Sequence, residues 1–229
     1  MNKKHHKEII VLLGKPGSGK GTQAEPLSKK LGIPFVSTGK LMREEIKKGT
    51  KLGKSIAADV AAGRLVPNKI TAFLLRRRLN KPDTKDGIII DGSPRDLEQA
   101  LLLEKISHVT HALLISITDK EVIRRIAGRR VCSKCGYNYH IHDNKPKVPG
   151  ICDRCGGEIV RRNDDKPSII KERLVSYRED TIPVLHYYRR LRALRRIEGQ
   201  GGIESVGERM FEAVKNSDKG LKIYAAWNS

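Results

Sequence analysis

The chain has 229 residues, which is enough for one domain with insertions or for two small domains. Hydrophobic residues make up 38% of it, and no apolar run approaches the roughly 20 residues that cross a bilayer, so a membrane-spanning protein is excluded. Lysine and arginine number 46 against 26 acidic residues, so the protein is strongly basic. The N-terminus lacks the apolar core of a signal peptide, and we therefore expect a soluble, cytoplasmic protein.

Short apolar runs alternate with helical patterns along the chain. Strands are predicted at residues 9–13, 33–37, 87–91 and 111–117, with a weaker fifth at 192–198. Near-continuous apolar strands separated by helices are typical of a parallel sheet covered on both faces. We therefore predict an α/β fold with three α/β/α layers and a parallel five-stranded sheet.

Helix signals lie between and after the strands. Thr118 and Glu121 have capping-box spacing, and apolar residues at helical spacing run from Ile203 to Val214. Two segments, 37–67 and 128–165, do not fit the alternation of strands and helices. We interpret both as insertions on one sheet domain.

A glycine-rich stretch, GKPGSGKGTQA, follows the first predicted strand. Gly14, Gly19 and Lys20 match the phosphate-binding pattern G-x-x-x-x-G-K, although Gly21 stands where Ser or Thr is usual and Thr22 follows it. The amides of this loop and the start of the next helix favour phosphate oxygens. The sequence therefore predicts a P-loop, and the candidate ATP-binding residues are Gly17, Ser18, Gly19, Lys20, Gly21 and Thr22.

A carboxylate ends the third predicted strand. Asp91 would lie at the carboxyl edge of the sheet, beside the glycine loop. A phosphate-binding loop needs a metal partner, and we expect Asp91 and Thr22 to hold Mg²⁺, directly or through water.

Four cysteines form two C-x-x-C pairs separated by sixteen residues. Two thiolate pairs on tight turns can converge on one tetrahedral Zn²⁺. Four protein ligands leave no open position for a substrate water, so we predict a structural zinc site, the alternative being a redox pair or two disulfides. The ligands would be Cys132, Cys135, Cys152 and Cys155.

The ordered motifs resemble those of the adenylate kinase family over nearly the whole chain, from about residue 8 to 214. After the glycine loop come STGKLMR, GRLVP, DGSPRDLEQA, GRR, RRNDD and KERL, at residues 37–43, 63–67, 91–100, 128–130, 161–165 and 171–174. This resemblance implies reversible, Mg²⁺-dependent transfer ATP + AMP = 2 ADP, with ATP, AMP and ADP as partners. It also implies a core of residues 1–36, 68–127 and 166–229, a helical AMP-binding insertion at 37–67 and a small β zinc-bearing lid at 128–165.

The same resemblance implies roles for individual residues. Arg125 and Arg129 would join the glycine loop in binding ATP. The AMP-binding residues would be Thr38, Arg43, Leu65, Val66, Gly92, Arg95, Gln99, Arg162 and Arg173. The catalytic set would be Lys20, Arg95, Arg129, Arg162 and Arg173. Phosphoryl transfer needs positioning and charge neutralisation more than proton transfer, so such a group of arginines suits the reaction.

Two positions depart from the family pattern. Lys40 stands where an acidic residue is common, and Ser93 stands where Phe is common. Loss of the aromatic ring would remove packing near the monophosphate pocket and could raise the KM or broaden acceptor choice.

The net charge of +20 leaves alternatives open. A solvated basic surface explains it simply, and a zinc-ribbon protein that binds nucleic acid would also carry such charge. Because Lys20, Asp91, Arg95 and Gln99 are all present, we favour the kinase, with another nucleoside monophosphate kinase or a GTP-dependent enzyme as closer alternatives. We expect a monomer with at most weak, non-specific polyanion association.

Overall fold

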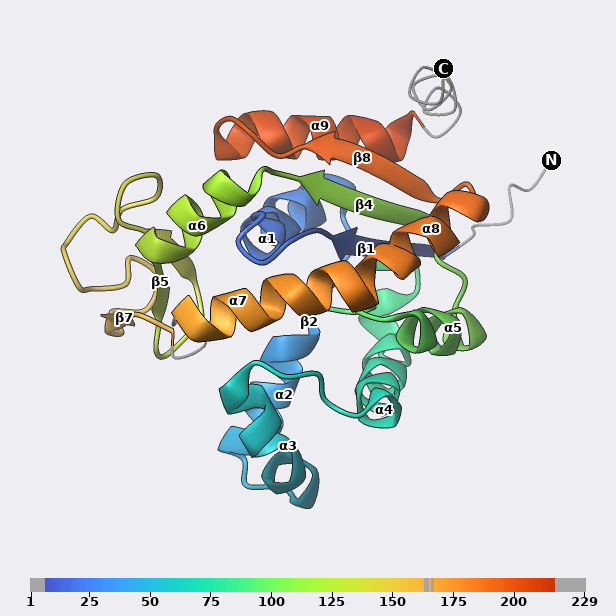
Figure 1. The fold of residues 1–229 in the computed structure, drawn as a ribbon, viewed down its shortest axis with the longest axis horizontal. Coiled ribbons are helices and arrows are strands. Elements are labelled where there is room, and N and C mark those ends of the chain that lie inside the picture. Colours follow the sequence, from blue (N-terminus) through green and yellow to red (C-terminus); the bar gives the residue numbers. More distant parts are fainter. Residues whose placement is uncertain (1–6, 163–164, 166, 217–229) are drawn as a thin grey trace.

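The computed structural model describes residues 7–162, 165 and 167–216. Its centre is a five-stranded sheet with strand order β2-β3-β1-β4-β8, in which every neighbouring pair is parallel (Figure 1). The strands are β1 (Glu8–Leu13), β2 (Phe35–Ser37), β3 (Gly87–Asp91), β4 (His111–Ser116) and β8 (Leu194–Glu198). The predicted parallel five-stranded sheet is confirmed.

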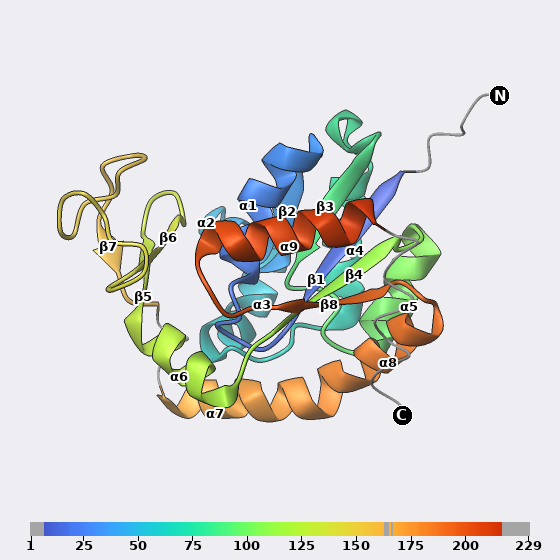
Figure 2. The ribbon, with the colours of Figure 1, turned by 90° about the horizontal axis from the view of Figure 1, so that it is seen from above.

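Helices cover both faces of this sheet, and Figure 2 shows α9 lying across one of them. In β1, Ile9 and Val11 pack with the helices of one face, while Ile10 and Leu12 pack with those of the other. Successive side chains of a strand point to opposite faces of the sheet, and both faces are buried here. Both sets of side chains are therefore apolar, which explains the nearly continuous apolar runs in the sequence. The first face carries α4 (Asn68–Leu79), α5 (Leu97–Ile106) and α8 (Ile182–Arg190), and the second carries α1 (Lys20–Leu31) and α9 (Ile203–Lys215).

Four strand boundaries differ from the prediction. The first strand begins one residue earlier, at Glu8. The second strand begins at Phe35, after Pro34, which has no N–H for a ladder. The fourth ends before Ile117, whose carbonyl oxygen accepts a hydrogen bond from Lys15 Nζ (3.1 Å). The fifth begins at Leu194 because Arg192 has a φ of 58° and belongs to a turn.

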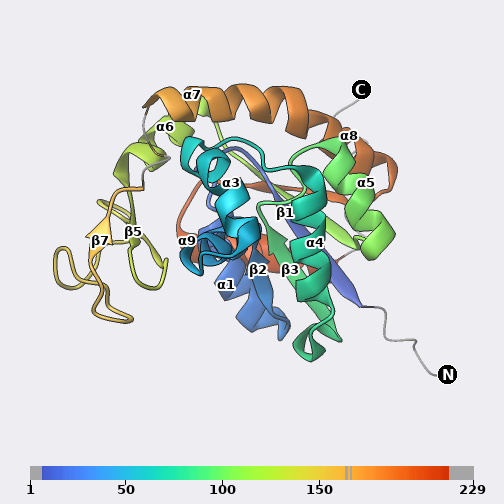
Figure 3. The same cartoon turned by 90° about the horizontal axis from the view of Figure 1, so that it is seen from below.

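The segment between β2 and α4 is helical, as predicted for this insertion. Its two helices pack against each other, and Figure 3 shows the second of them at the near side of the molecule. A Cβ on Gly53 would lie 2.2 Å from the carbonyl oxygen of Glu45, so glycine permits this close packing. The helices are α2 (Thr38–Lys47) and α3 (Lys51–Ala62).

A second, antiparallel sheet follows α6, to one side of the main sheet (Figures 1 and 2). Its strand order is β6-β5-β7, which confirms a small β structure around the cysteines. These elements are α6 (Asp119–Gly128), β5 (Arg129–Cys132), β6 (Asn138–His140) and β7 (Ile159–Val160).

The chain returns to the main sheet along a nearly continuous helical path. The remaining helical elements are α7 (Pro167–Ser176), a π-helical turn (Tyr177–Thr181) that joins it to α8, and a 3₁₀ turn (Pro82–Thr84) before β3. Among the described residues, no helix is long and apolar enough to cross a membrane.

Candidate active site

The glycine loop connects β1 to α1 at the carboxyl end of the central strand. Gly14, Gly17 and Gly19 have φ values of 140°, 74° and 101°. A Cβ on Gly14 would lie 2.6 Å from the carbonyl oxygen of Ile115, so a side chain there would collide with β4. Gly19 is the N-cap of α1 and offers no capping side chain, which leaves the positive end of the helix for an anion.

Lys20 lies at the start of α1 and folds back over the loop. Its Nζ donates to the carbonyl oxygens of Gly14 (2.6 Å) and Lys15 (2.9 Å) and to Ser18 Oγ (3.3 Å). Burial lowers the pKa of Lys20 to about 8, and the positive charges of three arginines add to this, while Asp91 opposes it. The arginines are Arg95, Arg173 and Arg129. The fold thus brings Lys20, Asp91 and these three arginines into one electrostatic neighbourhood.

Asp91 ends β3 beside this loop, as predicted. Its Oδ2 lies 3.5 Å from the position that a Cβ on Gly21 would occupy, so the carboxylate faces the first turn of α1. Thr22 lies in that same turn. A carboxylate and a hydroxyl beside a phosphate loop form a donor set that suits Mg²⁺.

A cleft of about 520 Å³, open to solvent, lies between the α2–α3 insertion and the main sheet. It is lined by all but one of the predicted AMP-binding residues: Arg43, Leu65, Val66, Gly92, Arg95, Gln99, Arg162 and Arg173. The exception, Thr38, is 2% exposed and borders the cleft, because its Oγ1 lies 2.7 Å from where a Cβ on Gly92 would stand. Met42 and Thr71 also line the cleft and were not predicted.

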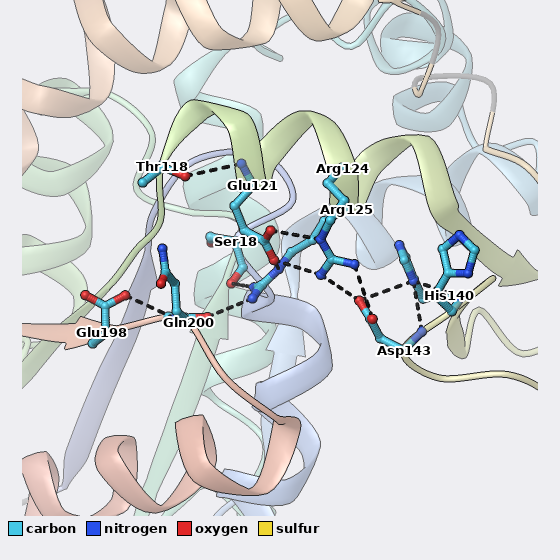
Figure 4. A network of polar contacts seen from close by, with 11 residues as sticks. Ser18, Thr118, Glu121, Arg124, Arg125, His140, Asp143, Glu198 and Gln200 are labelled. Carbon is cyan, nitrogen blue, oxygen red and sulfur yellow. Dashed lines mark hydrogen bonds and ion pairs between the residues drawn. The ribbon is translucent and has the colours of Figure 1, made fainter.

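Arg125 anchors the glycine loop (Figure 4). Its Nη1 donates to the Ser18 carbonyl (3.2 Å) and its Nη2 to the Gly199 carbonyl (2.8 Å), so one guanidinium joins the loop to the segment after β8. Glu121 accepts from Arg125 Nε (2.6 Å) and from Arg124, whose hydrogen bond lowers the pKa of Glu121 to about 2. The predicted cap is also confirmed, since Thr118 Oγ1 accepts from the Glu121 N–H (3.3 Å).

Arg129 lies at the junction of α6 and β5 and forms an ion pair with Asp165. Its Nε donates to Asp165 Oδ2 (2.7 Å), and its Nη2 contacts the other carboxylate oxygen. The Asp165 side chain is fully buried, whereas that of Arg129 is 17% exposed. Asp164, which precedes Asp165 in the RRNDD motif, lies outside the described residues.

The four cysteines converge as their spacing predicted. All four Sγ atoms lie within 4.8 Å of one another. The distances from Cys132 to Cys155 (3.5 Å) and from Cys135 to Cys152 (3.7 Å) are close to the roughly 3.8 Å that tetrahedral geometry with Zn–S bonds of about 2.3 Å requires. The four thiols are free, so the disulfide alternative is wrong.

A hydrogen bond favours the thiolate form of one cysteine, whereas burial raises the pKa of Cys135 to about 12. The Tyr139 hydroxyl donates to Cys152 Sγ (3.5 Å), which lowers the pKa of that thiol to about 6. Gly136 and Gly156, with φ values of 73° and 66°, close the two matching turns by donating to the carbonyls of Cys132 and Cys152 (2.9 Å each). Donor chemistry and geometry both fit a metal held by sulfur.

Sequence reasoning missed a polar chain around Gln99. Ser93 Oγ donates to Gln99 Oε1 (3.1 Å), and Gln99 Nε2 donates to Asn68 Oδ1 (2.9 Å). Ser93 was noticed only for the aromatic ring it lacks, and Asn68 was not noticed at all. The usable signals were a polar residue at the first position of a helix and the DGSPR stretch, which begins at the last residue of a strand.

The parallel sheet with a glycine loop, an adjacent carboxylate and a cationic cleft at its carboxyl edge defines a P-loop phosphotransferase. Comparisons with known proteins narrow this class. The adenylate kinase family profile matches residues 12–193, and the chain belongs to the adenylate kinase family.

Individual relatives agree with the family match. The chain is 42% identical over 210 residues to the adenylate kinase of Acetivibrio thermocellus, and the aligned region covers 90% of this chain and 97% of the relative. It is 45% identical over 202 residues to that of Methanothrix thermoacetophila (86% and 94% covered) and 44% identical over 196 residues to that of Treponema denticola (86% and 94%).

Proposed function

We propose that the protein transfers the terminal phosphoryl group of ATP to AMP, reversibly, giving two ADP. The observation that carries this proposal is that Lys20 interacts electrostatically with Asp91 and three arginines, two of which, Arg95 and Arg173, line the cleft. Two polyphosphates repel each other, and a concentration of fixed positive charge offsets this repulsion. Family membership supports the same reaction.

The chain's own residues would divide the work between two nucleotides. The glycine loop, Lys20 and Arg125 would hold the phosphates of ATP, with Lys20 exchanging its loop carbonyls for phosphate oxygens. Arg43 and Arg95 would grip the acceptor phosphate, and Leu65 and Val66 would contact its base. Planar guanidinium groups can bind phosphate oxygens at two points, which aligns donor and acceptor as well as neutralising charge.

A divalent cation would complete the site. Asp91 and Thr22 would hold Mg²⁺, which neutralises charge on the bound phosphates when present. No general base is needed, because the acceptor is already an anionic phosphate oxygen. Arg129, Arg162 and Arg173 would then stabilise the charge on the transferring group.

The segment 128–165 would act as a lid held in shape by Zn²⁺. Four cysteine thiolates fill a tetrahedral shell, so this zinc would be structural. Closure would expel water and direct the phosphoryl group to AMP rather than to hydrolysis. We also propose that residues 37–67 form the AMP-binding unit, and that the protein is a cytoplasmic monomer with only weak affinity for polyanions.

A coupled ADP assay tests the proposal. Unmutated protein with ATP, AMP and Mg²⁺ should form ADP, and omission of either nucleotide or of Mg²⁺ should abolish the signal. Lys20→Ala should lower kcat by orders of magnitude with an unchanged circular dichroism spectrum. A Lys20→Ala variant with near-normal kcat would show that the glycine loop is not the phosphate site.

A further inference from the structure

The side chain of Gln99 is held in one orientation by a chain of hydrogen bonds. Its Oε1 accepts from the Arg95 N–H (3.0 Å) and from Ser93 Oγ (3.1 Å). Its Nε2 donates to Asn68 Oδ1 (2.9 Å), and Asn68 Nδ2 donates to the carboxylates of Asp96 (3.2 Å) and Glu98 (2.7 Å).

The two ends of this series of hydrogen bonds determine which atom donates and which accepts in each of them. A backbone N–H can only donate, so the Gln99 atom that faces Arg95 must be the carbonyl oxygen. The ionised carboxylates of Asp96 and Glu98 can only accept, so the Asn68 atom that faces them must be the amide nitrogen. Both amide orientations are therefore fixed by chemistry, and Ser93 must donate.

Packing alone does not fix this side chain. Ser93 and Gln99, which are 1% and 5% exposed, border a narrow space whose other walls include Leu75, Leu103 and Ile106. This space has no room for a water molecule. Because water enters on this side poorly, each hydrogen bond to Gln99 here restrains the side chain more than an exposed hydrogen bond would.

Gln99 also lines the open cleft, with Leu65 and Val66. Both lone pairs of its oxygen are used by Ser93 and Arg95, and one of its two amide hydrogens is used by Asn68. One N–H of the Gln99 carboxamide therefore remains to donate to a ligand in the cleft.

We propose that Ser93 and Asn68 are positioning residues that hold the Gln99 carboxamide so that its remaining N–H donates to the base of the acceptor nucleotide. This inference rests on the proposed function. The base must then offer an acceptor atom. The unprotonated ring N1 of adenine does so, whereas hypoxanthine, in the otherwise similar nucleotide IMP, carries a hydrogen there.

Steady-state kinetics at saturating Mg-ATP, with AMP and IMP as acceptors, test the proposal. Ser93→Ala and Asn68→Ala should each raise the KM for AMP about two- to tenfold, the effect of one buried hydrogen bond, with kcat within twofold and the KM for ATP unchanged. The preference for AMP over IMP should fall by a similar factor. Ser93→Thr keeps the hydroxyl and should behave like the unmutated protein, as should the control Lys69→Ala, an exposed neighbour of Asn68.

Several outcomes would overturn the proposal. One is an unchanged KM for AMP and an unchanged AMP-to-IMP ratio in folded Ser93→Ala and Asn68→Ala. Another is a Ser93→Thr variant that behaves like Ser93→Ala, because the hydroxyl would then not be responsible.

A measurement on the unmutated protein avoids any effect of substitution on folding. In ¹⁵N-labelled protein, the Gln99 side-chain amide hydrogens should exchange with solvent at least tenfold more slowly than those of the exposed Gln200, and one of them should shift on addition of AMP. Equal exchange rates would contradict a fixed carboxamide. Absence of ADP formation by the unmutated protein would refute the proposed function, yet this exchange comparison would still report whether Gln99 is held.

Discussion

Arg154, in the second cysteine turn, forms a two-point ion pair with Glu25 of α1. Its Nη1 lies 2.9 Å from Oε1 and 2.7 Å from Oε2 of Glu25. The same guanidinium stacks over the ring of Tyr137, 3.7 Å from its centre. One arginine thus ties the cysteine-bearing segment directly to the helix that follows the glycine loop.

Breaking this ion pair should loosen the lid only modestly. The two side chains are 44% and 25% exposed, so the pair is worth about 1 kcal/mol at most. Glu25→Gln should raise the KM for ATP by up to about fivefold with little loss of kcat, and added salt should reduce the difference. Glu204→Gln, on the exposed start of α9, is the matched control. A Glu25→Gln variant that loses kcat a hundredfold would mean that Glu25 acts in the chemistry itself.

The buried ion pair of Arg129 and Asp165 should behave differently. Arg129→Ala leaves a fully buried carboxylate without its partner, which should destabilise the protein by about 3 kcal/mol. Adding Asp165→Asn removes the uncompensated charge and should restore much of the melting temperature. It should not restore kcat if Arg129 also neutralises phosphate. Recovery of kcat together with stability would assign Arg129 a structural role alone.

Stability should depend on pH through Lys20. Its pKa is about 8 in the folded protein against 10.5 ordinarily, so the unfolded chain holds more protons between these values. The cost of burying the charged lysine is complete below pH 8 and is relieved as the pH rises toward 10.5. The Tm of the unmutated protein should therefore rise relative to that of Lys20→Met from pH 7.5 to 10.

Scanning calorimetry of both proteins checks this pH dependence, with Lys85→Met as the control for loss of an exposed lysine. A Tm of the unmutated protein that stays constant or falls with pH, relative to the Tm of Lys20→Met, would contradict the assignment.

Metal analysis should find one Zn²⁺ per chain. Because four thiolates would fill its shell, chelation should lower the Tm and unfold the segment around the cysteines while leaving the main sheet intact. Cys152→Ser should lose thermal stability more than it loses kcat at low temperature. A Cys152→Ser protein that keeps its zinc and its Tm but loses all activity would show that the cysteines act in catalysis.

Features set by local sequence could be predicted. Strands β1, β3 and β4 each contain a continuous apolar run, and the cap of α6 needs only Thr118 and the N–H of Glu121, three residues on. The cysteine cluster follows from two short turns of identical geometry. In each case the residues that interact lie close in the chain or are joined by a simple rule of spacing.

Features that depend on how distant elements meet could not be predicted. Arg154 and Glu25 are 129 residues apart, and their contact requires the cysteine turn to lie against α1. Gln99 and Asn68 meet because the first turns of α4 and α5 lie side by side. The roles of individual arginines remain predictions, because arginine is so abundant in this chain that its presence alone decides nothing.

The central claim is transfer of a phosphoryl group from ATP, held by the glycine loop and Lys20, to AMP in the cleft that Arg95 and Gln99 line. The most direct measurement incubates the protein with Mg²⁺ and ATP labelled at its γ-phosphorus, together with AMP, CMP, UMP or GMP in turn, and follows the label. The label should appear in the β-phosphate of newly formed ADP, fastest with AMP, and only traces should appear as inorganic phosphate. Label released mainly as inorganic phosphate, or transferred faster to CMP, UMP or GMP than to AMP, would contradict the account.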